Sequence, residues 1–178
     1  LVEVLFLIPN SMFGTIMTLF FINDLGVSGV QFSQLLTFIG ITMIIFAIPM
    51  GMIIDKFGRK KPLLFGYALT FIAIPFIFDA SFTRLMLIAP VIGMINILFH
   101  TSTQALWADI IPEDMRGRVM GSRGFFTLIV VAAGSIGGGL IYDNISHTLP
   151  VNIFWIINIP CFIITLFFIT EPDRKKES

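Results

Sequence analysis

The side chains best placed to do chemistry lie in one short segment, which reads Gly51-x3-Asp55-Lys56-x-Gly58-Arg59-Lys60-Lys61. Asp55 ends a long apolar run. A carboxylate at the C-terminus of its own helix is unfavourable, so we expect it to bind an outside cation or the N-terminus of a neighbouring helix. Gly51 would let another helix approach closely, and Gly58 would permit a left-handed turn. A plain basic loop would explain Arg59 and Lys60, but it would not explain the spacing of the glycines and the aspartate.

Two further segments carry a regular pattern of charge or glycine. The first contains Asp109 and Arg116 and reads Ala108-Asp109-x2-Pro112-Glu113-x2-Arg116-Gly117-x3-Gly121. The second reads Gly134-Ser135-Ile136-Gly137-Gly138-Gly139 and is followed by Asp143. The plain interpretation of these glycines is tight packing between helices.

A third group of candidates consists of polar side chains inside apolar runs. Four of them recur at helical spacing and share one face of a predicted helix: Asn96, His100, Thr103 and Trp107. His100 lies nine residues before Asp109, about 13–14 Å along a helix, which places it near the middle of its run. An ionisable residue at that depth is a functional candidate, and a neutral histidine that is hydrogen-bonded to a neighbouring helix is an equally good interpretation. Asn10 and Thr37 complete the set of candidate solute-binding residues.

The sequence gives little support for a catalytic function. An intramembrane enzyme would need paired catalytic groups at one depth, or metal ligands. His100 has no convincing partner, and His147 is predicted at the far end of the chain's helices. No metal-ligand cluster or phosphate-binding loop is found in the sequence, and Cys161 is the single cysteine. We therefore expect a protein that is not an enzyme, with no cofactor, no metal and no nucleic-acid partner.

The elements that must position these residues are membrane-spanning helices. Of the 178 residues, 56% are hydrophobic and 12% are charged, against about 25% charged in a typical soluble domain. Six charge-free runs are each long enough for roughly the 20 helical residues that cross a ~30 Å hydrocarbon core, and they cover 4–23, 25–54, 62–78, 85–108, 124–142 and 144–170. Continuous apolar runs without alternation exclude a β-barrel. The predicted fold is an all-α membrane protein, with residues 1–178 forming a single six-helix domain in a lipid bilayer.

The distribution of lysine and arginine predicts how these helices are oriented. Most of the positive charge falls in segments 55–61 and 109–123 and in the tail 171–178, which lie on the same side of a six-helix chain. The other side holds Arg84 as its one basic residue. The positive-inside rule then places these three segments in the cytoplasm. We expect a multi-pass protein of the plasma membrane or bacterial inner membrane.

An internal repeat is indicated by an offset of 88 residues. At this offset Gly51 aligns with Gly139, Asp55 with Asp143, and Pro62 with Pro150, so one pattern ends the second and the fifth predicted helix. Three helices separate the two copies, which puts them on opposite faces of the membrane. This is typical of inverted three-plus-three repeats in secondary transporters, here about 1–79 and 84–170, although three identities in an apolar chain can also arise by chance.

The segment from Gly51 to Lys61 closely resembles the signature of the major facilitator superfamily (MFS), and every defined position matches. The segment from Ala108 to Gly121 and the glycine-rich fifth helix are also similar to that superfamily. The resemblance implies a secondary transporter with twelve helices in two halves that clasp a central cavity. This chain would be one half. The start at Leu1 instead of Met and the short charged tail favour the C-terminal half, whose partner would be the N-terminal six-helix half of the same protein.

The resemblance also implies roles for individual residues. Asp55 would face a helix N-terminus of the other half, and Arg59 would pair with Asp109, so that the signature acts as a conformational gate. The expected gate residues are Gly51, Asp55, Gly58, Arg59, Lys60, Asp109 and Arg116. The first, second, fourth and fifth helices would line a cavity for a small-molecule substrate.

A coupling proton is a further candidate partner. No Asp or Glu lies mid-membrane, so its carboxylates would belong to the other half unless His100 is involved. A channel-like or structural membrane subunit is the alternative to a transporter that moves a small solute by alternating access, and an intramembrane enzyme is the weaker one.

Overall fold

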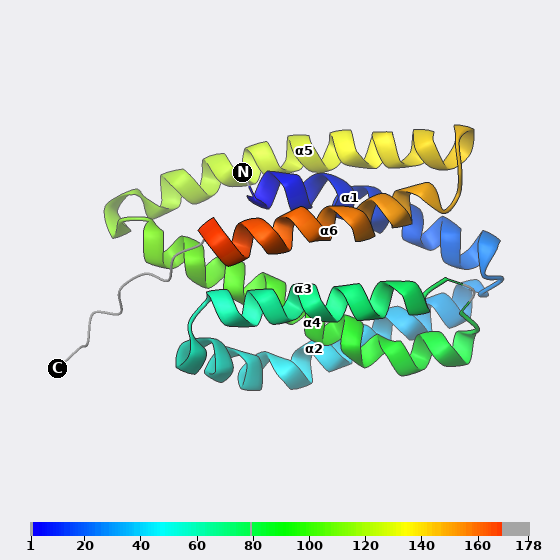
Figure 1. Ribbon diagram of the computed structural model, residues 1–178, viewed down its shortest axis with the longest axis horizontal. Helices are drawn as coiled ribbons and strands as arrows, with labels where there is room; N and C mark the ends of the chain where they lie inside the picture. The colour runs from blue at the N-terminus through cyan, green and yellow to red at the C-terminus, as the bar shows by residue number, and fades with distance from the viewer. Residues whose placement is uncertain (1, 79, 169–178) are drawn as a thin grey trace.

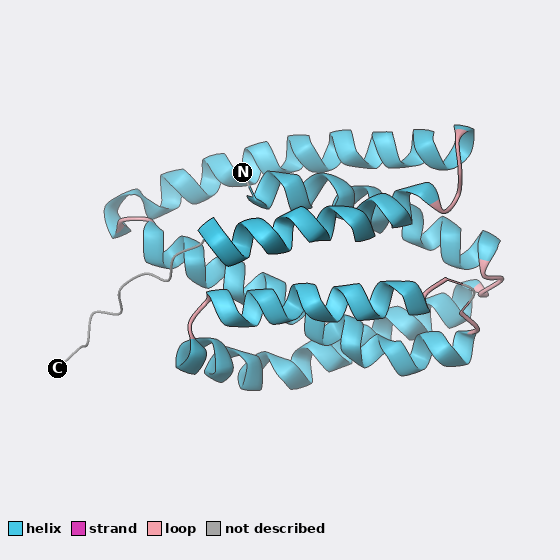
Figure 2. Ribbon diagram, viewed as in Figure 1, coloured by secondary structure: helices cyan, strands magenta, loops and turns pink. Residues whose placement is uncertain are grey.

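The computed structural model describes residues 2–78 and 80–168, and within these ranges every regular element is a helix (Figure 2). The long elements are α1 (Val2–Leu19), α2 (Gly29–Phe57), α3 (Lys60–Ala73), α4 (Phe82–Ile110), α5 (Arg116–Asn144) and α6 (Leu149–Phe168). Three short elements extend or join them: the π-helical turn η1 (Phe20–Asp24) and the 3₁₀ turns η2 (Ile74–Phe76) and η3 (Glu113–Met115). The predicted all-α fold is confirmed. The tail 171–178, expected in the cytoplasm, lies outside the described residues.

Two serine caps fix where α2 and α4 begin. The hydroxyl of Ser28 accepts a hydrogen bond from the backbone N–H of Gln31 (3.2 Å), and the Gln31 side chain accepts one from the N–H of Ser28 (2.9 Å). This reciprocal pair satisfies two donors that an α-helix leaves free at its start. Ser81 caps α4 in a similar way, by accepting from the N–H of Arg84 (3.5 Å).

Five of the described helices are long and apolar enough to cross a membrane: Phe6–Asp24, Gly29–Phe57, Phe82–Ile110, Glu113–Asn144 and Leu149–Phe168. The third predicted crossing, 62–78, differs because α3 has 14 residues, about 21 Å, before it tightens into η2. The cause is Pro75, which cannot donate a backbone hydrogen bond to the carbonyl of Phe71. The indole N–H of Trp155 on α6 donates to that carbonyl instead (3.3 Å). A sixth crossing therefore stays a prediction.

The six long helices form two layers. One layer contains α1, α5 and α6, and the other contains α2, α3 and α4 (Figure 1). Within the layers α1 packs on α5 and α6, α4 packs on α2 and α3, and α3 meets α6 where the layers join. If α1, α2 and α3 are exchanged with α4, α5 and α6 in that order, the same set of main contacts results.

Glycines mark the places where helix backbones come closest. A methyl group on Gly138 of α5 would lie 2.9 Å from the Cα of Met12 on α1. One on Gly93 of α4 would lie 2.9 Å from the carbonyl oxygen of Ile39 on α2. Small residues are favoured at such crossings because van der Waals contact between backbones drives helix association in lipid. The predicted tight packing of the glycine-rich segment is confirmed at Gly138, whereas Gly137 has no atom within 4 Å of such a methyl group.

The α1–α5 crossing predicts opposite effects for two neighbouring substitutions. Gly138→Ala should destabilise the protein by about 1–3 kcal/mol, because the added methyl group meets the backbone of α1 and the helices must separate. Gly137→Ala is the matched control, and it should be neutral or slightly stabilising because alanine favours the helix. Unfolding of the purified protein in detergent measures both. A Gly138→Ala protein at least as stable as the Gly137→Ala protein would contradict this packing.

Candidate functional site

The guanidinium of Arg59 lies at the centre of the first candidate site and joins two helix ends. Its Nε donates to Oδ2 of Asp109 at the end of α4 (3.0 Å), and its Nη1 donates to Oδ1 of Asp55 in the last turn of α2 (3.2 Å). Nη1 also donates to the carbonyl oxygen of Ile54 (3.2 Å). The side chain of Arg59 is 20% exposed and that of Asp55 is 78% exposed. One planar cation therefore holds carboxylates from both helices together, as the fork of donors on arginine allows.

The backbone of Gly58 makes this arrangement possible. Its φ of +89° and ψ of −177° lie in a region open to glycine and strained for other residues. Its N–H bonds to the carbonyl oxygen of Ile54 (3.0 Å), which closes the last turn of α2. The chain then reverses within one residue, so that Arg59 stands at the N-cap of α3 and faces back toward α2 and α4.

A second arginine caps the end of α4. The guanidinium of Arg116, the first residue of α5, donates to the carbonyl oxygen of Ala108 (3.1 Å). This satisfies one of the acceptors that an α-helix leaves free at its C-terminus and places positive charge where the helix dipole is negative. Lys60 begins α3 beside this cluster. A methyl group on Gly51 would have no described atom within 4 Å, so within the described residues no helix makes the close approach expected there.

The predicted solute-binding residues of α4 lie along its surface. Asn96 and His100 are exposed, and Thr103 and Trp107 are half-buried. The Asn96 side chain donates to the carbonyl oxygen of Ile92 one turn earlier (2.8 Å). Arg123 of α5 lies over the Trp107 ring, with its guanidinium carbon 5.0 Å from the ring centre.

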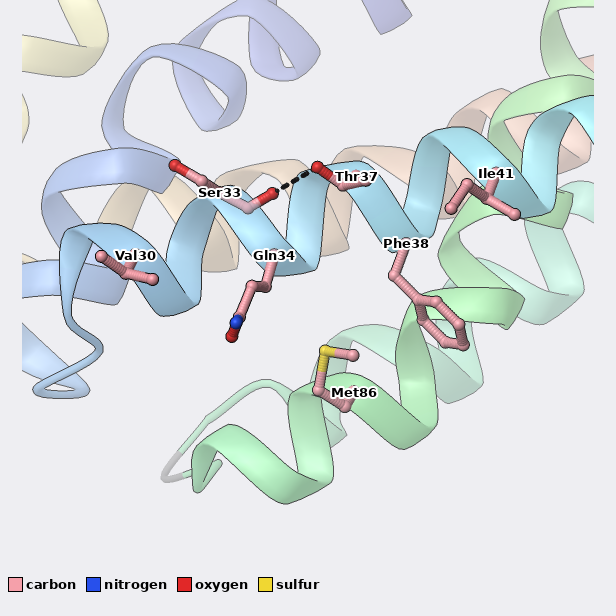
Figure 3. A pocket seen from close by; sticks show the side chains of 7 residues that line it. All are labelled: Val30, Ser33, Gln34, Thr37, Phe38, Ile41 and Met86. Atoms are coloured by element: carbon pink, nitrogen blue, oxygen red, sulfur yellow. Dashed lines mark hydrogen bonds between the residues drawn. The ribbon is translucent and has the colours of Figure 1, made fainter.

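The other two predicted binding residues lie on different helices. Asn10 is exposed on α1, and Thr37 is exposed on α2 with its hydroxyl donating to the carbonyl oxygen of Ser33 (2.8 Å). Thr37 lines an open groove of about 330 Å³, in which most of the lining comes from α2 and one side chain, Met86, comes from α4 (Figure 3). The described residues do not bring all six predicted binding residues into one enclosed pocket.

A second groove of about 340 Å³ runs between α1 and α5 and is almost wholly apolar. It is lined by Ile8, Met12, Ile129, Val130, Ala133, Gly134, Gly137 and Ile141. The two grooves thus lie on the two helix pairs, α2–α4 and α1–α5, that exchange with each other in the packing pattern.

A polar cluster at the opposite end of the helices was missed by sequence reasoning. Asp24, at the end of η1, accepts a hydrogen bond from the hydroxyl of Tyr142 on α5 (2.6 Å). The other oxygen of Asp24 lies 2.7 Å from Nδ1 of His147, and the rings of Tyr142 and His147 stack with centres 4.3 Å apart. The 88-residue offset could have pointed to it, since His147 occupies the position of Arg59 in the second copy.

Comparison with known proteins places the chain in a family. Residues 1–178 match the family described as Major Facilitator Superfamily. An uncharacterized transporter of Buchnera aphidicola is 31% identical over 147 residues, which are 77% of this chain and 34% of that protein. The quinolone resistance protein NorA of Staphylococcus aureus is 25% identical over 162 residues, 89% of this chain and 41% of NorA.

An uncharacterized MFS-type transporter of Methanocaldococcus jannaschii is 32% identical over 85 residues, 47% of this chain and 21% of that protein. The chain therefore spans between about a fifth and two fifths of the length of these curated relatives. Two of these relatives are named as transporters, and five of the described helices can cross a membrane. This chain is accordingly a multi-pass membrane protein that belongs to the Major Facilitator Superfamily.

Proposed function

We propose that this chain is a six-helix unit of a secondary transporter, which moves a small solute by alternating access together with a second six-helix unit. The observation that carries the proposal is the Arg59 cluster, which binds the ends of α2 and α4 through two carboxylates at the margin of the helices. A contact of this kind can exist in one conformation and break in another. A purely structural subunit has no need of it.

The proposal includes a sixth crossing and an inverted repeat. The exchange of α1–α3 with α4–α6 preserves the main helix contacts, as two related halves would. Pro62 and Pro150, which align in the sequence offset, are both buried in the first turn of α3 and of α6. With η2 and the residues that flank it, α3 would complete the third crossing, with repeats of about 1–79 and 84–170.

In the proposed gate, Arg59 exchanges partners as the transporter changes state. Asp55 is mostly exposed and so remains accessible to a group on the second unit. Asp109 is 33% exposed and is held by Arg59. Movement of α4 relative to α2 would separate Asp109 from Arg59 and leave both charges to water or to new partners. Gly51, Gly58, Lys60 and Arg116 would shape and anchor the same region, which we place in the cytoplasm with segments 55–61, 109–123 and the tail.

The second unit would cover surfaces that are unusually apolar. On α2, Ile44 and Ile48 are 76% and 75% exposed, and on α5 Leu128 is 70% exposed. Lipid or another protein can cover such residues. The partial coverage of the relatives favours a second unit of the same protein. The place of this chain as the C-terminal half stays a prediction from its sequence. The solute would bind where the polar faces of α1, α2 and α4 meet that unit.

The name of the NorA relative suggests a first solute to test, a quinolone. Counterflow in proteoliposomes that contain the full-length protein distinguishes a transporter from a channel-like subunit, because unlabelled solute trapped inside accelerates uptake of labelled solute only through a carrier. Absence of counterflow together with a steady solute current would favour a channel. The alternative of an intramembrane enzyme is disfavoured, because the Buchnera and Methanocaldococcus relatives are named as transporters.

Removal of the guanidinium tests the gate. Arg59→Ala in the full-length protein should raise the rate at which a cysteine at position 111, buried directly after α4 and two residues from Asp109, reacts with a water-soluble maleimide. An increase of about two- to fivefold is expected, the range for partly exposed ion pairs. Lys61→Ala removes an exposed cation from the first turn of α3, two residues after Arg59, and is the matched control. Equal labelling in the Arg59→Ala, Lys61→Ala and unsubstituted proteins would exclude the gate role.

The exposed face of α4 makes a second prediction. His100→Ala and Asn96→Ala should each weaken solute transport by about tenfold in kcat/KM, the effect of one lost hydrogen bond of about 1.4 kcal/mol. Leu87→Ala is the control, because Leu87 is 74% exposed on α4 and lies about half a turn around the helix from Asn96. Wild-type kinetics in both polar variants, with the solute that gives counterflow, would remove this face from the binding site.

A further inference from the structure

The cluster of Asp24, Tyr142 and His147 is the structural counterpart of the Arg59 cluster at the other end of the helices. His147 follows Arg59 by 88 residues, the offset that aligns Pro62 with Pro150. Each of the two bases lies in the connection after a long helix, α2 or α5. Each binds an aspartate at the end of another helix. Arg59 binds Asp109 in the last turn of α4, and His147 binds Asp24 at the end of η1, which extends α1. The exchange of α1–α3 with α4–α6 therefore also exchanges the contact of Arg59 with Asp109 for the contact of His147 with Asp24.

The two contacts differ in one chemical property. The guanidinium of arginine keeps its charge at all physiological pH values. Histidine is the side chain that ordinarily gains or loses its charge between pH 5 and pH 8. With a protonated imidazole, the 2.7 Å contact between His147 and Asp24 is a charge-assisted hydrogen bond, which is about twice as strong as one between neutral groups. The contact should therefore be tighter in acid and looser at neutral and alkaline pH.

We propose that Asp24, Tyr142 and His147 form a second, proton-sensitive latch, which ties the end of α1 to the connection between α5 and α6. Tyr142 orients the carboxylate by donating to one oxygen, so that the other oxygen faces the imidazole. Stacking of the Tyr142 ring on His147 fixes the plane of the imidazole. The proton is the ligand of this site. Its binding draws the end of α1 toward the connection between α5 and α6, whereas Arg59 joins the ends of α2 and α4.

The charged groups around His147 support the same direction of the effect. Asp24 approaches from η1 with a side chain 25% exposed, and His147 itself is 55% exposed, so water and protons reach the pair. Asp143 follows Tyr142 on α5 and adds negative charge near the cluster. Described residues of α6, and of the first turn of α2, carry no charge. Arg84 lies in the first turn of α4, in the other layer of helices, and is exposed.

The test measures local opening in the detergent-solubilised full-length protein. A cysteine replaces Val27, which is 3% exposed and lies three residues after Asp24, and its rate of reaction with a maleimide is measured at pH 5.5 and pH 7.5. A cysteine at Ile145, which is 68% exposed, corrects for the effect of pH on thiol reactivity itself. The corrected rate should be about two- to fivefold lower at pH 5.5, as expected for a partly exposed ion pair.

Two substitutions identify the titrating group. His147→Arg should make the corrected rate low at both pH values, because the charge becomes permanent, and His147→Gln should make it high at both. A cysteine at Ile111, beside the Arg59 cluster, should show no dependence on pH. A pH dependence that survives both substitutions, or one that is equal at positions 27 and 111, would overturn the proposal.

The pH-dependent contact between His147 and Asp24 does not depend on the proposed transporter function. Only its effect on transport rests on that function. The labelling rate is measured without a membrane and without a solute. A protein that fails to show counterflow can therefore still display the pH-dependent contact, and a carrier can lack it, so that failure of this proposal and failure of the transporter proposal are distinguishable.

Discussion

The arrangement of charge in this protein depends on one constraint: helix ends at a membrane margin carry unsatisfied carbonyl groups, and nearby carboxylates make the charge there more negative. Arg59 meets both needs, because it binds the carbonyl of Ile54 and the carboxylates of Asp55 and Asp109. Arg116 meets the first need in the last turn of α4, by donating to the carbonyl of Ala108. The loops between α2 and α3 and between α4 and α5 are thereby tied to helix ends.

The interior of the helices is held by a different kind of contact. Away from the margins, glycine-centred crossings bring α1 onto α5 and α2 onto α4 without long side chains between them. A hydrogen bond from Thr15 to Ser135 (2.7 Å) adds a polar tie at the first crossing. Because lipid offers no hydrophobic drive for helix association, such close contacts carry much of the specificity. The charged ends and the glycine crossings are thus separate devices, and substitutions in one need not disturb the other.

Sequence reasoning predicted the helices well and their partners poorly. The apolar runs locate the long helices because the thickness of a bilayer sets their length. The early end of α3 does not follow from the length of the apolar run 62–78, because it depends on Pro75 inside that run. The contact between Arg59 and Asp109 joins residues 50 positions apart, and the resemblance to the family pointed to it where periodicity could not. The offset of 88 residues contained His147, but its partner Asp24 became evident once α1 and α5 were seen side by side.

The carbonyl of Phe71 shows how a proline inside an apolar helix is tolerated. Pro75 leaves that acceptor free, and the indole of Trp155 on α6 fills it. The two residues complement each other, because Pro75 removes the helical donor of this carbonyl and the indole of Trp155 supplies another. In an alignment of related chains, the residues at the positions of Pro75 and Trp155 should therefore change together.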